Sequence, residues 1–247
     1  MMRANGAICR PSIKTAFTRM GTTDYTLSMT LKLYAHPFSS YCQKALIAFE
    51  ENGTPFELAM LETGSAASAE CSRLWPLNRF PVLEDGGRVV PEATIIIEYL
   101  ATHYPGPVSL IPTDLDAALN VRLLDRFFDN YVMTPQGNIV FESLRPADKR
   151  DPYGVEQAQA LLDKAYLWLD ARMADRVWAS GEAFSLADCA AAPALLYADW
   201  TYPIPPSLTN VHAYRTRLLQ RPSYALVLDR ARPYRHFFPL GAPTDRD

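Results

Sequence analysis

The residues best suited to chemistry come early in the chain, in the stretch His-Pro-Phe-Ser-Ser-Tyr-Cys-Gln-Lys at positions 36–44. A predicted strand ends here and a predicted helix begins. The first backbone N–H groups of a helix have no partner inside it, and the helix dipole favours negative charge at that end. Ser39 or Ser40 can therefore cap the helix or hold an anion, and spacing alone favours the cap. Cys42 can be a thiol of low pKa by the same argument, or an inward small apolar residue, which we favour.

A second motif that can contact a ligand is Arg79-Phe80-Pro81. A proline that opens a strand can follow a cis peptide bond, which exposes the backbone groups of the preceding residue to an extended ligand. Sequence alone makes the cis form the less common outcome. The motif therefore indicates a binding edge only in combination with other sites.

The third motif is Pro91-Glu92-Ala93-Thr94, at the start of another predicted helix. The Glu92 carboxylate either favours the positive end of the helix dipole or binds an ammonium group of a ligand. Taken alone, the motif favours the structural role.

The elements that position these motifs can be predicted from periodicity and turn residues. Alternation predicts a strand over residues 31–35, helix formers with an apolar face predict a helix over 41–52, and a second strand follows over 55–61. This strand–helix–strand unit favours parallel strands with a right-handed crossover. A loop containing Trp75 comes next. The remaining elements are strands over 81–84 and 88–90, which flank Asp85-Gly86-Gly87 as a hairpin, and a helix over 92–103.

A Pro-rich break over residues 104–112 separates this first unit from a stretch with helical periods only. We predict an α/β unit of order βαβ–ββα followed by an all-helical unit, with a loop-like tail from Arg232 onward. The predicted helices span residues 114–133, 154–174, 186–199 and 210–220. The predicted organisation is an extension over 1–29, an α/β domain over 30–103, a linker over 104–113 and a helical domain over 114–247.

Composition excludes several classes of protein. Of 247 residues, 49% are hydrophobic and 21% charged, which is ordinary for a globular chain and excludes a mainly disordered one. The net charge of −3 offers no global basic field, so we expect no nucleic-acid partner, and no apolar run approaches the ~20 residues of a membrane helix. The four cysteines and four histidines show no zinc spacing, so we assign no metal. Scattered cysteines favour a reducing, cytoplasmic location.

Charge is unevenly distributed along the chain. Residues 1–29 carry a net charge of +3, while the rest of the chain carries −6. The basic head lacks the apolar core of a secretory signal. We interpret it as a flexible extension, or as the product of an upstream start with Met29 opening the folded protein. A transit peptide is the alternative.

The three motifs, in this order and spacing, resemble the glutathione S-transferase superfamily over about residues 30–225. That family combines a thioredoxin-like N-terminal domain with an all-helical C-terminal domain. Independent support comes from Phe184-Ser185-Leu186-Ala187-Asp188, which is similar to the family's N-capping box. In that box Ser185 caps the helix and Asp188 returns to the backbone, so the role is structural.

The resemblance implies a role for each matching position of the first and second motifs. Ser39 matches the hydroxyl with which serine-type members, the theta- and zeta-like classes, hydrogen-bond the glutathione sulfur, with Ser40 as the alternative one residue on. Phe80 precedes the family's cis-proline, Pro81, and its backbone should pair with the cysteinyl backbone of glutathione. Arg79 matches an often basic position that can reach a carboxylate of glutathione.

The third motif departs from the family pattern. Glu92 matches the acid of the family's Glu-Ser pair, but Ala93 replaces the serine that helps hold the γ-glutamyl carboxylate. A hydrogen bond to a charged group contributes about 1.5–3 kcal/mol, or roughly 10- to 150-fold in affinity. Thr94 can partly substitute, although it lies one helical step away. The alanine therefore puts the strength of glutathione binding in question.

By resemblance, the expected function is that of a glutathione transferase, in which glutathione is a co-substrate whose thiolate attacks a small hydrophobic electrophile. The electrophile pocket should lie between the domains beside residues 125–131, where an acid–arginine pair such as Asp125 with Arg122 favours a solvated helix face. A glutathione-dependent isomerase, lyase or dehalogenase, a non-catalytic binding protein and a thiol transferase using Cys42 are the alternatives. Tyr34 is a less favoured source of the hydroxyl. The resemblance also implies a homodimer.

Overall fold

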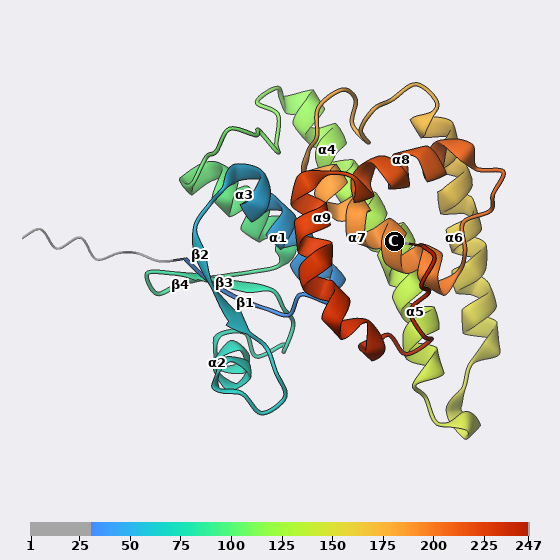
Figure 1. Ribbon diagram of the computed structural model, residues 1–247, viewed down its shortest axis with the longest axis horizontal. Coiled ribbons are helices and arrows are strands. Elements are labelled where there is room, and N and C mark those ends of the chain that lie inside the picture. Colours follow the sequence, from blue (N-terminus) through green and yellow to red (C-terminus); the bar gives the residue numbers. More distant parts are fainter. Residues whose placement is uncertain (1–30, 247) are drawn as a thin grey trace, which may run out of the picture.

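The computed structural model describes residues 31–246, and its N-terminal part is built on a four-stranded mixed sheet (Figure 1). The strand order is β2-β1-β3-β4, with β1 parallel to β2 and the other two pairs antiparallel. The predicted extension over residues 1–29 lies outside the described residues. The strands are β1 (Leu31–Ala35), β2 (Phe56–Met60), β3 (Val82–Asp85) and β4 (Arg88–Pro91).

Three helices cover the two faces of this sheet. α1 (Ser40–Asn52) and α3 (Ala93–His103) pack on one face, where their apolar residues join the main core. α2 (Ala66–Leu74) packs on the other face, against a small cluster that includes Tyr34 and Cys71. The sequence predicted only a loop between β2 and β3, and that prediction is wrong. Cys71 is the one fully buried residue of α2, so the helix lacks the apolar stripe by which periodicity is recognised.

The C-terminal part is entirely helical, and the molecule has the predicted thioredoxin-like and all-helical parts (Figure 1). Residues of α5 and α9 were not predicted as helices. The elements are α4 (Leu115–Phe127), the π-helical η1 (Phe128–Met133), α5 (Thr134–Ser143), the short η2 (Ala147–Lys149), α6 (Pro152–Met173), α7 (Leu186–Thr201), α8 (Thr209–Leu219), α9 (Pro222–Ala231) and the 3₁₀ turn η3 (Arg232–Phe237).

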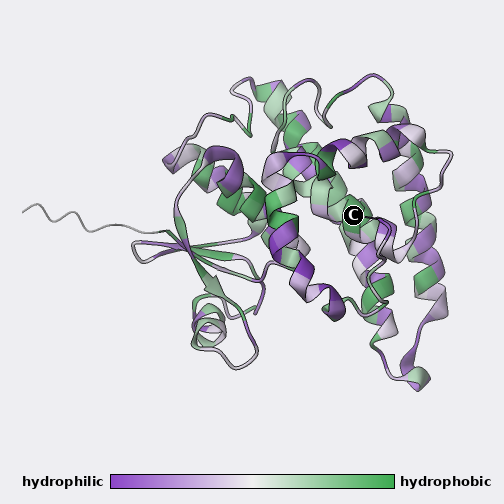
Figure 2. Ribbon diagram, viewed as in Figure 1, coloured by the Kyte–Doolittle hydropathy of each residue, from purple (hydrophilic) through white to green (hydrophobic). Residues whose placement is uncertain are grey.

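α7 is the central helix of this part, and every residue from Leu186 to Trp200 is buried. Its neighbours wrap around it, and its hydrophobic colouring in Figure 2 follows this position. The predicted capping box begins it: the Ser185 N–H donates to Asp188 Oδ2 at 2.9 Å. Asp188 also accepts from the Ala179 N–H at 2.9 Å and from the Tyr214 hydroxyl at 2.6 Å. The box is therefore confirmed, and it also ties α7 to α8.

The helix predicted over residues 114–133 consists of α4 followed by η1. Pro135 has no N–H to offer the Tyr131 carbonyl, and the turn that precedes it widens into the π-helical η1. On α4, Val121 and Leu124 face the core, whereas the leucines at four-residue steps are exposed. Those exposed leucines are Leu115 (80%), Leu119 (63%) and Leu123 (62%).

The two parts of the molecule pack through α1, which lies between the sheet and α7 (Figure 1). The Gln43 amide donates to the Tyr197 hydroxyl at 3.0 Å, and that hydroxyl donates to the Phe38 carbonyl at 2.6 Å. The loop that leads into α1 is thereby tied to the helical part. Within residues 31–246, no helix is long and apolar enough to cross a membrane.

Candidate functional site

The first motif lies at the start of α1, as predicted, and Ser39 is its N-cap residue. The Ser39 Oγ accepts from the Cys42 N–H at 3.4 Å. The loop before it is held by two backbone contacts: the Ser39 N–H donates to the His36 carbonyl at 3.0 Å, and the Phe38 N–H donates to His36 Nδ1 at 3.1 Å. Because a hydroxyl can accept and donate at once, the capping role leaves the Ser39 O–H available as a donor.

The structure separates Ser39 from the other groups considered for the chemistry. Ser40 is the first residue of α1 and is half-buried. Cys42 is fully buried, and burial raises the pKa of its thiol to about 12. Tyr34 is also buried, and its hydroxyl donates to Glu84 Oε2 at 3.0 Å on the α2 side of the sheet. Cys42 is thus the small inward residue that we favoured, and it does not supply a reactive thiolate.

The second motif adopts the geometry that suits an extended ligand. The Phe80–Pro81 peptide bond is cis. Pro81 is buried, whereas Arg79 and Phe80 are exposed, the latter by 43%. The β1–β3 ladder ends at the pair Tyr34 and Val82, so the backbone of Phe80 lies beyond the last pair of that ladder.

The third motif differs from its prediction, since the helix begins at Ala93 and Glu92 lies outside it as the N-cap residue. The Glu92 backbone has φ 73° and ψ 122°, a conformation that costs a non-glycine residue about 1–3 kcal/mol and that clusters at ligand sites. No side chain caps α3. The first hydrogen bond of the helix runs from the Ile96 N–H to the Glu92 carbonyl at 2.9 Å, so earlier N–H groups are free to face a ligand.

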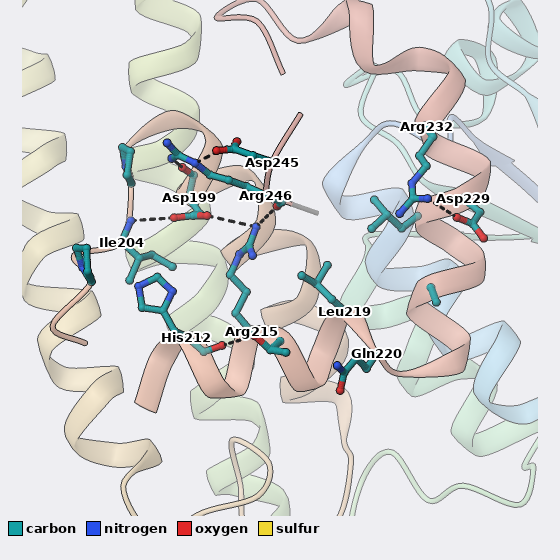
Figure 3. Close-up of a pocket in the computed structure, with 15 residues that line it drawn as sticks. Asp199, Ile204, His212, Arg215, Leu219, Gln220, Asp229, Arg232, Asp245 and Arg246 are labelled. Carbon is teal, nitrogen blue, oxygen red and sulfur yellow. Dashed lines mark hydrogen bonds and ion pairs between the residues drawn. The ribbon is translucent and has the colours of Figure 1, made fainter. Parts of the chain in front are cut away.

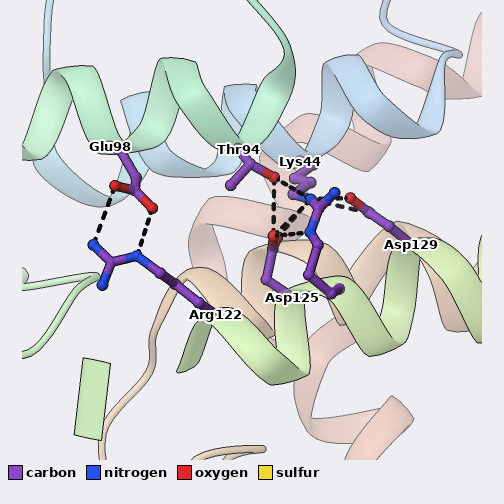
Figure 4. Close-up of polar contacts among 7 residues, drawn as sticks. Lys44, Thr94, Glu98, Arg122, Asp125 and Asp129 are labelled. Carbon is purple, nitrogen blue, oxygen red and sulfur yellow. Dashed lines mark hydrogen bonds and ion pairs between the residues drawn. The ribbon is translucent and has the colours of Figure 1, made fainter. Parts of the chain in front are cut away.

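A buried cluster of charges lies directly behind this helix start (Figure 4). Lys44 of α1 is 1% exposed, and its Nζ lies 2.6 Å from Asp125 Oδ1 and 2.9 Å from Asp129 Oδ2. Arg126 joins the same two carboxylates at 2.8 and 2.6 Å, and half of its side chain is exposed. We name Lys44, Asp125, Arg126 and Asp129 the ion cluster.

The hydroxyl of Thr94 connects the ion cluster to α3. It donates to Asp125 Oδ2 at 3.0 Å and accepts from Lys44 Nζ at 2.9 Å and from Arg126 Nη2 at 2.7 Å. A hydroxyl has one proton and two lone pairs, so this one is fully used. Thr94 is therefore unable to replace the serine hydroxyl that Ala93 lacks, contrary to the expectation from sequence.

A direct contact joins the two helices near their starts: Lys44 of α1 donates to the hydroxyl of Thr94 of α3 at 2.9 Å. Burial raises the pKa of Tyr41, two residues after Ser39, to about 12, and charges on Asp129, Arg126 and Glu92 also act on it. Burial also raises the pKa of the Asp129 carboxyl, against the lowering effect of Lys44. The two helix starts therefore lie close to each other and to the ion cluster.

Sequence reasoning missed the ion cluster and paired Asp125, one of its members, with Arg122, which lies outside it. Arg122 pairs with Glu98 of α3 at 2.8 Å, whereas Asp125 faces Lys44 and Arg126 (Figure 4). Asp125 is 1% exposed and does not lie on the solvated helix face that we expected. One signal was present: Lys44 interrupts an inward run of apolar residues, and a buried lysine requires acidic partners.

Two hollows of the surface lie apart from the three motifs. A cavity of about 630 Å³ lies among α8, α9 and the tail, where Arg215 contacts Asp199 at 3.3 Å (Figure 3). A groove of about 370 Å³, the α4–α6 groove, is lined mostly by apolar side chains, including Leu123, Tyr131 and Trp168. No residue of the three motifs lines either one, so neither is the candidate site. Among residues 31–246, no group of three His, Cys, Asp or Glu side chains is placed to hold a metal ion.

Two family models match the chain in the order of its two parts. The model for the glutathione S-transferase N-terminal domain matches residues 33–108, and the model for the C-terminal domain matches residues 152–217. The chain belongs to the glutathione S-transferase superfamily. The matched ranges contain all three motifs and the capping box of α7.

Individual members of the superfamily are distant relatives of this chain. Glutathione S-transferase theta-1 of Bos taurus is 29% identical over 183 residues, which cover 68% of this chain and 73% of the relative. A stringent starvation protein A homolog of Coxiella burnetii is 25% identical over 205 residues, which cover 80% of this chain and 91% of the relative. A glutathione S-transferase structure from Methylobacterium radiotolerans, in complex with glutathione sulfonate, has a TM-score of 0.71 at 27% identity. The match covers 80% of this chain and 94% of that one.

Proposed function

We propose that this protein is a glutathione transferase that binds glutathione across the starts of α1 and α3. The observation that carries the proposal is Ser39 at the start of α1, whose Oγ accepts from the Cys42 N–H and keeps its proton to donate. A free thiol with a pKa of about 8.5 is mostly protonated at neutral pH. A hydrogen bond from Ser39 and the positive end of the α1 dipole both favour the thiolate, so they lower the pKa of a glutathione thiol bound there.

The proposed reaction is the addition of the glutathione thiolate to an electrophilic carbon. The thiol proton leaves to solvent, a sulfur–carbon bond forms, and either a leaving group departs with its electron pair or the adjacent carbon takes a proton. Ser39 acts as a hydrogen-bond donor throughout and forms no covalent bond. Ser40 is the alternative donor, although it does not make the capping contact of Ser39.

The remaining motif residues would hold the tripeptide. The backbone of Phe80, beside the cis bond to Pro81, is proposed to pair with the cysteinyl backbone of glutathione. The exposed Arg79 side chain would contact a carboxylate, and Glu92 the ammonium of the γ-glutamyl group. Ala93 would contribute only its backbone N–H. Support comes from the relative whose structure contains glutathione sulfonate and matches nearly the whole described chain.

Calorimetric titration of the full chain with glutathione tests this function. We expect a dissociation constant in the millimolar range or tighter, and in Ser39→Ala a higher thiol pKa of the bound ligand. A Ser40→Ala variant is the matched control and should retain the wild-type thiol pKa. Absence of binding at roughly 10 mM glutathione would overturn every glutathione-dependent function.

Two alternatives remain within the same fold. The same thiolate site can serve an isomerase, lyase or dehalogenase, and turnover assays with the corresponding substrate classes distinguish these reactions. A non-catalytic binding protein is favoured by Ala93. Binding of glutathione without any lowering of its thiol pKa would favour this second alternative.

We also propose a homodimer and a reducing, cytoplasmic location. Leu115, Leu119 and Leu123 expose an apolar stripe along α4, and soluble monomers rarely expose large contiguous apolar patches. A second copy of the chain would cover this stripe together with the α4–α6 groove. Light scattering should give twice the chain mass, and Leu119→Glu should give the monomer mass. The cysteines within the described residues are buried free thiols, consistent with a reducing compartment.

A further inference from the structure

Arg126 is the one member of the ion cluster whose side chain reaches solvent to a large extent. Half of its side chain is exposed, whereas Lys44, Asp125 and Asp129 are buried. We propose that Arg126 binds the γ-glutamyl carboxylate of glutathione, in place of the serine hydroxyl that Ala93 lacks. This inference rests on the proposed function and assigns a further binding residue to the same site.

The hydrogen bonds of Arg126 leave part of its guanidinium group available to donate to a ligand. Nε and Nη2 donate to Asp125 Oδ2 at 3.1 and 2.8 Å, and Nη2 also contacts Asp129 and Thr94. Within residues 31–246, no acceptor contacts Nη1. These contacts occupy Nε and Nη2 and hold the planar group in place, so Nη1 can donate to a carboxylate without further ordering of the side chain.

Arg126 lies beside the first turn of α3, where the serine hydroxyl is missing. Its Nη2 lies 2.7 Å from the hydroxyl of Thr94, the residue directly after Ala93 at the uncapped start of α3. Thr94 is unable to bind the ligand itself because its hydroxyl has used its proton and both lone pairs. Arg126 is therefore a donor beside the first turn of α3 that can supplement its free N–H groups.

The charges of the site also fit this end of glutathione. The two cations and two anions of the ion cluster balance, so Arg126 can offer a positive edge without creating a net positive pocket. The γ-glutamyl group carries one ammonium and one carboxylate. Glu92, exposed at the start of α3, would take the ammonium, and Arg126 would take the carboxylate.

The test uses two ligands that differ only in the carboxylate. S-methylglutathione and S-methyl-(4-aminobutanoyl)-cysteinylglycine, which lacks the γ-glutamyl carboxylate, are titrated into the wild-type chain and into Arg126→Gln. Methylation removes any contribution of the thiol. A hydrogen bond to a charged group implies a 10- to 150-fold loss of affinity for S-methylglutathione in the variant, with less than about threefold loss for the analogue.

Arg122→Gln is the matched control, because Arg122 lies one turn earlier on α4 and pairs with Glu98 of the same helix α3. It should bind both ligands as the wild type does. Arg126→Lys retains the charge beside Asp125 and Asp129 but not the guanidinium geometry, and should lose about three- to tenfold for S-methylglutathione only. This variant carries the test if Arg126→Gln does not fold.

The outcomes separate the inference from the proposed function. Failure of the wild-type chain to bind either glutathione or S-methylglutathione overturns the proposed function, and the role of Arg126 with it. Wild-type binding combined with an equal loss for the two ligands in the Arg126 variants, or with no loss, overturns the role of Arg126 alone. A loss restricted to the ligand that carries the carboxylate supports it.

Discussion

The starts of α1 and α3 face the same region but are built differently. At α1, Ser39 caps the helix with its own hydroxyl, and the residues behind it are mostly apolar. At α3, no side chain caps the helix, its N-cap residue Glu92 has a positive φ, and the ion cluster lies behind it. The first offers a single neutral donor, whereas the second offers free N–H groups among fixed charges.

This difference corresponds to the two ends of the proposed ligand. A hydrogen-bond donor and the positive end of a helix dipole stabilise a thiolate and so lower the pKa of the thiol. A carboxylate nearby would have the opposite effect. A zwitterionic γ-glutamyl group needs charges of both signs at fixed positions. We therefore expect substitution of the Ser39 cap to alter the thiol pKa, and substitutions at the start of α3 or in the ion cluster behind it to alter affinity or stability.

The largest expected effect is on stability, at Lys44. Lys44→Met leaves Asp125 and Asp129 buried with only Arg126 as a cationic partner. Removing one partner of a buried ion pair costs about 3–5 kcal/mol. Urea denaturation should show this loss in the free energy of unfolding. Lys32→Met, which breaks the exposed contact with Glu57, should lose less than about 1 kcal/mol. Equal losses would refute the structural role of the ion cluster.

The second largest effect is on catalysis, at Ser39. The lost hydrogen bond to a thiolate is worth about 1.5–3 kcal/mol, so kcat/KM of Ser39→Ala at neutral pH should fall roughly 10- to 150-fold. Because the cause is a raised thiol pKa, the loss should shrink as the pH of the assay increases. A loss that stays constant up to pH 9 would indicate a different role for Ser39.

A smaller effect is expected at Ala93. Ala93→Ser adds a hydroxyl at the start of α3. The proposed donor Arg126 already lies beside that helix start. Affinity for glutathione should therefore increase less than about tenfold in the wild-type background and more in Arg126→Gln. Calorimetry on the four proteins of this cycle measures the difference. Equal gains in both backgrounds would show that the two groups act independently.

The Cys42 thiol is expected not to react in the folded protein. With the pKa of the thiol raised to about 12 by burial, only about one molecule in ten thousand carries a thiolate at pH 8. Iodoacetamide should leave the peptide that contains Cys42 unmodified in the folded protein and modify it in urea, as mass spectrometry of digests can establish. Modification of the folded protein would restore Cys42 as a candidate for thiol transfer.

The sequence was informative where local chemistry decides the structure. The Ser39 cap and the capping box of Ser185 and Asp188 depend on residue types at short spacing, and the structure has both. The cis bond before Pro81 is also present, but only the resemblance to the superfamily implied it. The resemblance to the superfamily also rested on such short motifs, and the matches of the two domain models support it.

The sequence was uninformative where packing decides the structure. α2 buries too little apolar surface to show a helical period. The partners of Lys44 come from α4 and η1, about eighty residues further along the chain, and no local rule connects them. The same limit applied to Thr94, whose hydroxyl looked available until its three partners were placed around it.

The most direct test is an ultraviolet titration of the thiolate of glutathione bound to the wild-type chain and to Ser39→Ala. We predict a bound thiol pKa about one to two units lower in the wild type than in the variant, as follows from a hydrogen bond worth about 1.5–3 kcal/mol. A bound thiol pKa that is the same in both proteins, and equal to that of free glutathione, would contradict it.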